Sequence, residues 1–212
     1  MPIYQLTDQI AFPPIEGAEE GIVAVGGDLS TERLELAYQS GIFPWFSECD
    51  PIVWWSPDPR YVLYPEKLKV SKSMKQVLRK NDFRVTFNKD FEQVIDNCRK
   101  IVREGQNDTW ITTGMKKAYI ELHKKGLAIS VEVWQNNELV GGLYGIDMGN
   151  VFCGESMFAK VSNASKVGFI TFVKAFQKKG GEIIDCQVYT SHLASLGAEE
   201  IDREAFMTYL EK

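Results

Sequence analysis

Three consecutive segments near the middle of the chain read as strands, and they limit the possible folds more than any other feature. Their sequences are AISVEVWQ, ELVGGLYGID and NVFCGES, at 128–135, 138–147 and 150–156. Two residues separate each segment from the next. Asn136-Asn137 tolerates the positive φ that a two-residue hairpin turn demands, and Met148-Gly149 supplies the second turn. We therefore predict three consecutive antiparallel strands.

Apolar residues at helical spacing mark the segments on both sides of these strands. We expect helices over 71–80, 91–105, 114–126 and 166–179, and a short strand over 83–88. Ser71 is the expected N-cap of the first of these helices, and Gly105 is the expected end of the second. The order helix, three antiparallel strands, helix, strand, helix is typical of acetyltransferase-like (GNAT-type) acyl-transfer folds.

The first third of the chain is less regular. The Gly-rich segment 21–29 predicts close backbone approaches at Gly26-Gly27, and a helix follows with Ser30 or Thr31 as its N-cap and Gly41 at its end. We predict an α+β chain with a small N-terminal α/β domain over residues 1–66. Residues 67–212 form the predicted acetyltransferase-like domain.

A polar pair interrupts the last predicted strand, in the sequence EIIDCQV at 182–188. Side chains alternate across a strand, so Asp185 and Gln187 share one face while Ile184 and Cys186 share the other. A buried carboxylate and carboxamide are costly unless they are hydrogen-bonded or used in chemistry. Both a structural and a catalytic role fit this pattern. A short helix should follow, with Ser191 as its N-cap and a stop at Gly197.

An aromatic, proline-rich segment and a basic segment are the other notable stretches. GIFPWFSECDPIVWWSPDPRYVLYP, at 41–65, holds five prolines and three tryptophans, which fits either a rigid packed loop or a surface that stacks nucleobases. In the window 67–84 seven residues are basic, and Asp82 is the only acid. Such a window is either a solvated helix face or a contact for phosphates.

Composition excludes several classes of protein. No apolar run approaches the roughly 20 residues of a membrane span, and the first 32 residues carry no Lys or Arg, so we expect a cytoplasmic protein. The two histidines exclude an HExxH metal site. The four cysteines contain no CxxC pair, which argues against a zinc site or a disulfide framework: Cys49, Cys98, Cys153 and Cys186.

Two enzyme classes find weak support in short motifs. CGESMF at 153–158 half-matches the G-x-S-x-G elbow of serine hydrolases, which would need Ser156 with His192 or His123 as its base. A coenzyme A-dependent acetyltransferase would need a Gly-rich turn for the pyrophosphate, and the segment 158–168 has no G-x-G spacing.

Ten short motifs follow one another along nearly the whole chain. They are AVGGDLS, GIFPWF, WWSPDPR, TWIT, SVEVW, LVGGLYG, FCGESMF, NASK, DCQ and HLASLGA. Together they resemble the leucyl/phenylalanyl-tRNA–protein transferases of bacteria. The resemblance implies transfer of Leu or Phe, and sometimes Met, from aminoacyl-tRNA to proteins with N-terminal Arg or Lys, which creates an N-degron for proteolysis. It implies no metal and no coenzyme, because the ester is already activated, and we expect a monomer without membrane contact.

The same resemblance implies roles for particular residues. Asp185 and Gln187 of DCQ would form the peptide bond, while Trp45 and Trp110 would hold the 3′ adenosine of the tRNA. Glu155 would lie in the acceptor-peptide region. The donor side chain would enter a pocket of six residues: Leu143, Phe152, Phe169, Phe172, Phe176 and Ile184. The basic window suggests tRNA contacts from four residues: Lys72, Lys75, Arg79 and Lys80.

Ester aminolysis suits the polar pair. An N-terminal α-amine has a pKa of ~7.7–8.0, so a nearby hydrogen-bond acceptor suffices to activate it. Gln187 can accept through its amide oxygen, while Asp185 polarises or orients that amide. Thr190 stands where the family commonly has Asn, and 126–130 is GLAIS where the family often has G-H-A-H-S. A module with this fold that binds aminoacyl-tRNA or a peptide without catalysis is the rival hypothesis.

Overall fold

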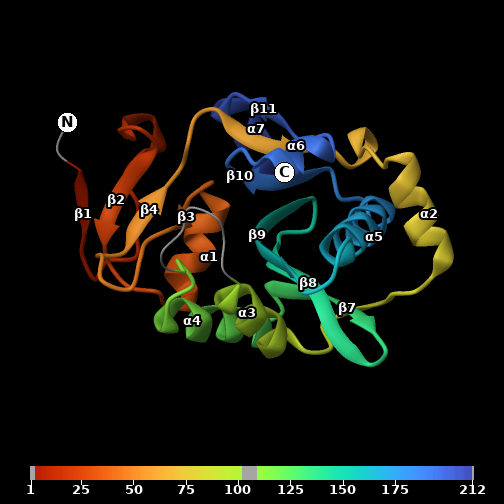
Figure 1. Ribbon diagram of the computed structural model, residues 1–212. Helices are drawn as coiled ribbons and strands as arrows, with labels where there is room; N and C mark the ends of the chain where they lie inside the picture. Colours follow the sequence, from red (N-terminus) through yellow and green to blue (C-terminus); the bar gives the residue numbers. More distant parts are fainter. Residues whose placement is uncertain (1–2, 102–108, 212) are drawn as a thin grey trace.

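The chain forms two β-sheets with helices packed around them (Figure 1). The computed structural model describes residues 3–101 and 109–211. Over these residues it contains a four-stranded sheet, a seven-stranded sheet and seven α-helices. The α+β class predicted from the sequence is therefore confirmed.

The smaller sheet has the strand order β1-β2-β4-β3. Its strands are β1 (Tyr4–Leu6), β2 (Ile22–Gly26), β3 (Phe43–Pro44) and β4 (Val53–Trp55), and a 3₁₀ turn, Ile15–Gly17, precedes β2. Trp54 is fully buried, and its indole N–H donates to the Gly26 carbonyl at 2.9 Å. Trp45 remains 39% exposed. The aromatic segment therefore supplies both a core residue and a surface residue.

Helix α1 (Thr31–Gln39) begins and ends as predicted. Gly26-Gly27 has φ of +81° and +73°, and the Ser30 side chain then accepts from the backbone N–H of Arg33. Gly41 follows the helix with φ +69°. A Cβ at Gly41 would lie 2.5 Å from Met207 Sδ, so glycine also lets the C-terminal helix pack closely here.

The larger sheet has the order β11-β5-β10-β9-β8-β7-β6. Its central strands β7 (Ala128–Gln135), β8 (Glu138–Asp147) and β9 (Val151–Ala159) are antiparallel, which confirms the prediction from the sequence. Asn136-Asn137 has φ of +50° and +63° at the first hairpin. The outer strands are β5 (Arg60–Leu63), β6 (Arg84–Phe87), β10 (Ile183–Gln187) and β11 (Glu199–Ile201).

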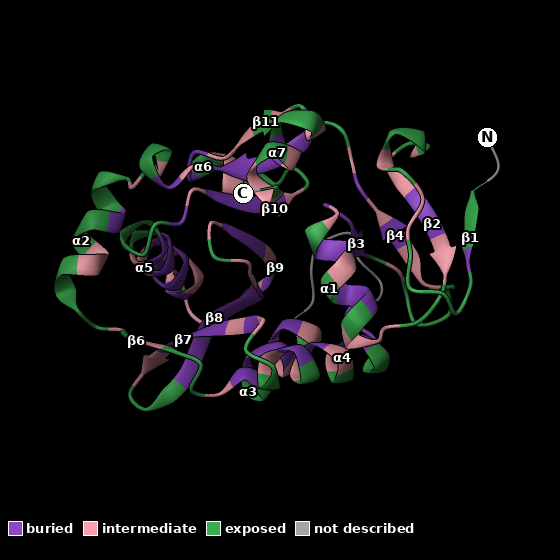
Figure 2. Ribbon diagram, turned by 180° about the vertical axis from the view of Figure 1, so that it is seen from behind, coloured by how far each residue is buried: buried purple, intermediate pink, exposed green. Residues whose placement is uncertain are grey.

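Helices cover both faces of the larger sheet (Figures 1 and 2). α3 (Phe91–Lys100) and α4 (Thr113–Lys124) pack on one face, and α5 (Ala164–Lys178) packs on the other. The sheet residues between them are buried almost throughout β8 and β9. α2 (Lys72–Lys80) lies outside α5 and buries only Met74, while α6 (Ser191–Ser195) and α7 (Arg203–Leu210) complete the edge near β11.

Several local predictions were wrong. Helix α3 ends at Lys100, because Ile101 has extended backbone angles of φ −72° and ψ 124°. The predicted stop at Gly105 lies outside the described residues. Thr190 rather than Ser191 caps α6, since the Thr190 hydroxyl accepts from Leu193 N at 3.2 Å. Strand β11 was not anticipated, because three residues are too few for a visible period.

Strand β5 bears on the predicted division between residues 66 and 67. It pairs with β10 and β11 in the larger sheet, although it lies within residues 1–66. A 3₁₀ turn, Pro65–Lys67, follows it directly. The division into two domains stays a prediction.

The two parallel strands of the larger sheet separate partway along their length. β10 pairs with β9 only at Ile183–Asp185, opposite Val151–Cys153, whereas β9 continues along β8 to Ala159. The register against β5 also shifts between Asp185 and Gln187. The sheet therefore opens beside the second half of β9, directly after Asp185.

The cap of α6 gives a stability prediction with a built-in control. Thr190→Ala removes the hydroxyl that accepts from Leu193 N, so we expect it to lower the free energy of unfolding by about 1 kcal/mol. Ser191→Ala removes a neighbouring hydroxyl without a capping role and should change stability by less than about 0.5 kcal/mol. Urea unfolding measures both, and equal losses would show that Thr190 is not the cap.

Candidate active site

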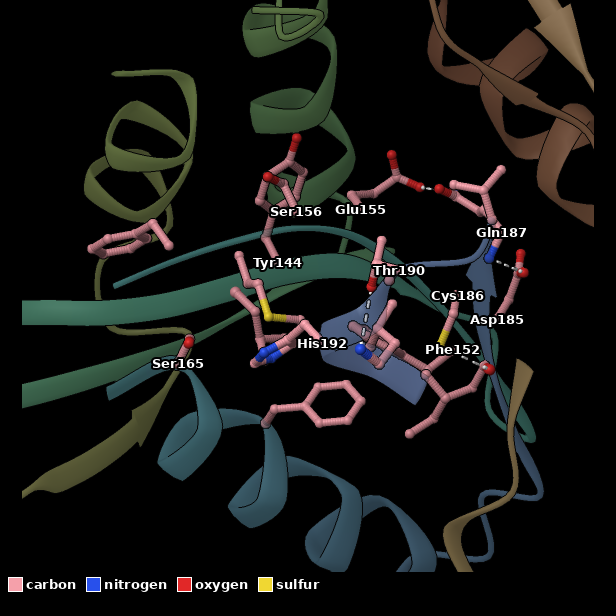
Figure 3. Close-up of a pocket in the computed structure, with 18 of the residues that line it drawn as sticks. Tyr144, Phe152, Glu155, Ser156, Ser165, Asp185, Cys186, Gln187, Thr190 and His192 are labelled. Atoms are coloured by element: carbon pink, nitrogen blue, oxygen red, sulfur yellow. Dashed lines mark hydrogen bonds between the residues drawn. The ribbon is translucent and has the colours of Figure 1, made fainter. Parts of the chain in front are cut away.

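A cavity of about 490 Å³ lies where β10 turns away from β9 (Figure 3). Its wall combines apolar side chains of β8, β9, α5 and β10 with aromatic side chains from the segments near β3 and before α4. A few polar groups of β9 and β10 interrupt this apolar wall. Cavities of this size and composition are typical of small-molecule sites.

A buried ion pair fixes the strand that carries the polar pair. Arg60 is 1% exposed and Asp185 is 0% exposed. Arg60 Nε donates to Asp185 Oδ1 at 2.8 Å, and Arg60 Nη2 donates to Asp185 Oδ2 at 2.6 Å. Burial alone would lower the pKa of Arg60, but the adjacent Asp185 carboxylate raises it above its ordinary value. The guanidinium therefore stays charged and directs both carboxylate oxygens.

Asp185 also holds the backbone of Gln187. The N–H of Gln187 donates to Asp185 Oδ1 at 2.9 Å. Gln187 has φ +65°, a left-handed conformation that is rare for residues other than Gly, Asn and Asp. Asp185 therefore orients Gln187 through its main chain. Ile184 and Cys186 join the apolar cluster around α5, as predicted, but the regular strand alternation is interrupted between Asp185 and Gln187, where the register shifts.

The side chain of Gln187 is oriented by a second carboxylate, Glu155. Gln187 Nε2 donates to Glu155 Oε1 at 3.0 Å. In this arrangement the NH₂ group of Gln187 faces Glu155. The carbonyl oxygen of the Gln187 amide therefore lies on the opposite side of the amide and is left to accept a hydrogen bond within the cavity.

Two tyrosines complete the surroundings of Glu155. The Tyr38 hydroxyl donates to Oε1 at 2.8 Å, and the Tyr119 hydroxyl donates to Oε2 at 2.9 Å. The two hydroxyls also contact each other closely. Burial raises the pKa of Glu155 to about 7, although the tyrosine hydrogen bonds act in the opposite direction. Burial and the Glu155 charge raise the pKa values of both tyrosines well above the ordinary range.

Most of the predicted site residues meet at this cavity. Nine of them belong to its wall: Trp45, Trp110, Leu143, Phe152, Glu155, Phe169, Ile184, Asp185 and Gln187. Phe172 and Phe176 do not line it. They lie behind Phe152, with ring centroids 4.3 Å and 6.2 Å from its ring, and so support the wall from the α5 side.

The predicted tRNA contacts lie away from the cavity, on the outward face of α2. All four side chains are exposed: Lys72, Lys75, Arg79 and Lys80. Within the described residues none of them takes part in an ion pair. Their charges are therefore available to an external partner.

The sequence reasoning missed Arg60, Tyr38 and Tyr119 as site residues. The helical spacing places Tyr38 on the inward face of α1 and Tyr119 on the inward face of α4, which is correct, but both positions are typical of core aromatics. Arg60 carried a usable signal, because it is a charged residue that opens the apolar strand YVL. A charge at the start of a buried strand requires a partner.

Among the described residues, no serine hydrolase arrangement occurs in the cavity. His192 lines it, but His192 Nε2 is buried without a hydrogen-bond partner, so that nitrogen does not contact Ser156. Burial, and then the charge of Lys166, lower the pKa of His192. His123 lies outside the cavity wall, where it stacks on Phe91 and bonds through Nδ1 to the Ala128 carbonyl.

Neither a metal cluster nor a membrane-spanning helix occurs in the described residues. Across 3–101 and 109–211, no three or more His, Cys, Asp or Glu side chains gather where they could hold a metal ion. Over the same residues, none of the helices has the length and apolar character needed to cross a membrane.

The raised pKa of Glu155 predicts a pH-dependent stability. The folded protein keeps this proton up to about pH 7, whereas an ordinary glutamate loses it near 4.5, so the folded state binds more protons between these values. Stability therefore falls as the pH rises through this window. Between pH 4.5 and about pH 8, wild-type protein should lose about 3 kcal/mol more than Glu155→Gln, because one pH unit of difference corresponds to about 1.4 kcal/mol.

Denaturant unfolding across this pH range measures the effect. Glu121→Gln, on the exposed surface of α4, is the control and should follow the wild-type curve. Parallel curves for wild type and Glu155→Gln would show that Glu155 does not hold a proton in the folded state.

The chain matches one protein family over most of its length. A family model described as "Leucyl/phenylalanyl-tRNA protein transferase" matches residues 62–211, and the model of that family's N-terminal domain matches residues 27–58. The chain is also similar to a GCN5-related glucosamine N-acetyltransferase region of a fungal multi-domain β-N-acetylglucosaminidase. That solved structure has a TM-score of 0.46 and 11% identity over 84% of this chain and 23% of the other.

Two curated relatives are similar over almost their full length. A leucyl/phenylalanyl-tRNA–protein transferase of Flavobacterium johnsoniae is 60% identical over 98% of this chain and 99% of its own. A protein of the same name from Christiangramia forsetii is 56% identical over 98% of this chain and 100% of its own. The chain therefore belongs to the leucyl/phenylalanyl-tRNA–protein transferase family of aminoacyltransferases.

Proposed function

We propose that this protein transfers Leu or Phe, and to some degree Met, from aminoacyl-tRNA to the N-terminal Arg or Lys of acceptor proteins. The product carries a new N-terminal residue joined by a peptide bond and serves as an N-degron for proteolysis. The observation that carries the proposal is the fixed side chain of Gln187, which lines a largely apolar cavity and turns its NH₂ group to Glu155, leaving its carbonyl oxygen to accept.

The donor end of aminoacyl-tRNA suits two parts of the cavity wall. Trp45 and Trp110 offer aromatic faces on which the 3′ adenosine can stack. Phe152, Phe169 and Ile184 offer an apolar surface for the aminoacyl side chain. Because such a surface reads size rather than hydrogen bonds, it accepts Leu, Phe and Met and rejects charged side chains, whose burial is costly.

The reaction is aminolysis of an ester. The α-amine of the acceptor forms a bond to the ester carbonyl carbon, the bond from that carbon to the ribose oxygen breaks, and the amine proton ends on the ribose oxygen. Gln187 accepts a hydrogen bond from the amine through its carbonyl oxygen and so orients the nitrogen lone pair. The ester is already activated, so much of the acceleration comes from placing amine and carbonyl ~3–3.5 Å apart.

Asp185 contributes indirectly in this scheme. Its two oxygens bond to Arg60 and to the main chain of Gln187, so it orients Gln187 rather than contacting the incoming amine. Glu155 orients the amide from the other side. With a pKa of about 7, Glu155 also carries a partial negative charge that favours a basic acceptor residue.

The proposed activity and the role of Gln187 can be tested together. Wild-type protein given labelled Leu-tRNA and an Arg-starting peptide, without acetyl-CoA, should form labelled peptide. Gln187→Gly removes the side chain and also relieves the left-handed backbone, so the variant should stay folded. Its single-turnover rate should fall by about 10²-fold or more, while its affinity for aminoacyl-tRNA stays near that of wild type.

Asn136→Gly, which likewise relieves a positive φ but lies at the exposed β7–β8 turn outside the cavity wall, is the matched control and should keep the wild-type rate per folded molecule. Binding of Leu-tRNA without any transfer would identify a binding module instead. A full rate in folded Gln187→Gly would remove Gln187 from the reaction.

The basic face of α2 should bind tRNA phosphates. Replacing Lys72, Lys75, Arg79 or Lys80 by Ala should reduce the slope of log affinity against log salt concentration by about 0.7 to 0.9 for each phosphate that the side chain neutralises. Lys117→Ala, on the exposed face of α4, is the control and should leave the slope unchanged. An unchanged slope in the α2 variants would mean that this face is only solvated.

A further inference from the structure

Arg60 is the most buried cation near the cavity, and it does not line the cavity wall. It begins β5, where it pairs with Ile201 of β11. Its guanidinium contacts two aromatic rings, with Cζ 4.9 Å from the ring centroid of Phe43 and 4.8 Å from that of Phe206. Its N–H donors lie in the plane of the guanidinium, so they form hydrogen bonds at its edges.

The hydrogen bonds at those edges reach two separate parts of the chain. Nε and Nη2 donate to the two oxygens of Asp185, and Nη1 donates to the Gly41 carbonyl at 3.1 Å. Three hydrogen bonds and two ring contacts fix the plane of the guanidinium, and its bidentate contact fixes the orientation of the Asp185 carboxylate. Lysine could supply the charge but could not fix the carboxylate in this way.

The fixed carboxylate determines the conformation of Gln187. Asp185 Oδ1 accepts from both Arg60 Nε and the Gln187 N–H. Gln187 has φ +65°, and a non-glycine residue keeps such a backbone only where its surroundings hold it there. The direction of its side chain toward Glu155 follows from that backbone.

We propose that Arg60 is a positioning residue for aminoacyl transfer, which it serves by holding Gln187 in its left-handed conformation through Asp185. The inference rests on the proposed function. It assigns the bidentate pair a task beyond stability, because well-packed apolar residues replace many buried ion pairs without loss of stability. Arg60 itself touches no substrate.

The test compares Arg60→Met, Arg60→Lys, Asp185→Asn and the double variant Arg60→Met/Asp185→Asn in single-turnover transfer. Arg60→Met should lower the rate constant per folded molecule by about 10²-fold, with the half-saturating aminoacyl-tRNA concentration changed by less than about twofold. Arg60→Lys should be intermediate. The double variant should be no slower than its slower parent, because both changes break the same chain of contacts.

Arg33→Met is the matched control. Like Arg60, Arg33 is a buried arginine, 0% exposed, in an ion pair, here with Asp28. Its other partners are the carbonyls of Thr7 and Gln9, away from the cavity. Its loss should lower stability and leave the rate per folded molecule unchanged. Hydrogen exchange at the Gln187 amide is the second readout, and it should speed up in Arg60→Met and Arg60→Lys but not in Arg33→Met.

Wild-type rates and wild-type exchange at Gln187 in folded Arg60→Met would overturn the proposal. A double variant would also overturn it if its rate constant fell by the product of the fold-decreases in the two single variants. If Arg60→Met does not fold, Arg60→Lys and the double variant, which leaves no unpaired charge, decide by the same criteria. Absence of transfer by wild-type protein would instead overturn the proposed function, and hydrogen exchange would still test the hold of Arg60 on Gln187.

Discussion

The separation of β9 from β10 is the constraint on which the rest of the structure depends. The two strands share hydrogen bonds only as far as Cys153 and Asp185. Beyond that point the side chains of both strands surround a cavity instead of packing against each other. The apolar wall, the two tryptophans and the polar groups all converge on this opening, so the position at which strand pairing stops also determines where chemistry can occur.

The two buried carboxylates of the site have different roles because their neighbours differ. Asp185 faces a guanidinium fork and serves as a fixed acceptor for the main chain of Gln187. Glu155 faces the hydroxyls of Tyr38 and Tyr119, which stabilise its charge less, and burial raises its pKa to about 7. Asp185 thus serves as an anchor through its ion pair with Arg60, whereas Glu155, whose donors in the described residues are neutral, titrates near neutral pH.

Local sequence signals predicted the central strands and most helix starts, because turn residues and caps act over a few positions. Asn136-Asn137, Ser30 and Ser71 all behave as expected. The polar pair of β10 was found because a charge in an apolar strand is conspicuous. The ion pair of Arg60 was missed, since its partner lies far along the chain and no period links them. The roles of the predicted site residues stay predictions.

The guanidinium of Arg60 contacts residues that the ribosome adds both early and late in synthesis. Gly41 and Phe43 come early, Asp185 comes late, and Phe206 lies on α7, the last helix of the chain that the structure describes. During synthesis the smaller sheet and the β7–β9 hairpins can form while this cluster still lacks members, because contacts between distant residues form after local ones. If transfer depends on this cluster as proposed, a nascent chain would be folded over most of its length and could bind charged tRNA before it could transfer the aminoacyl group at the full rate.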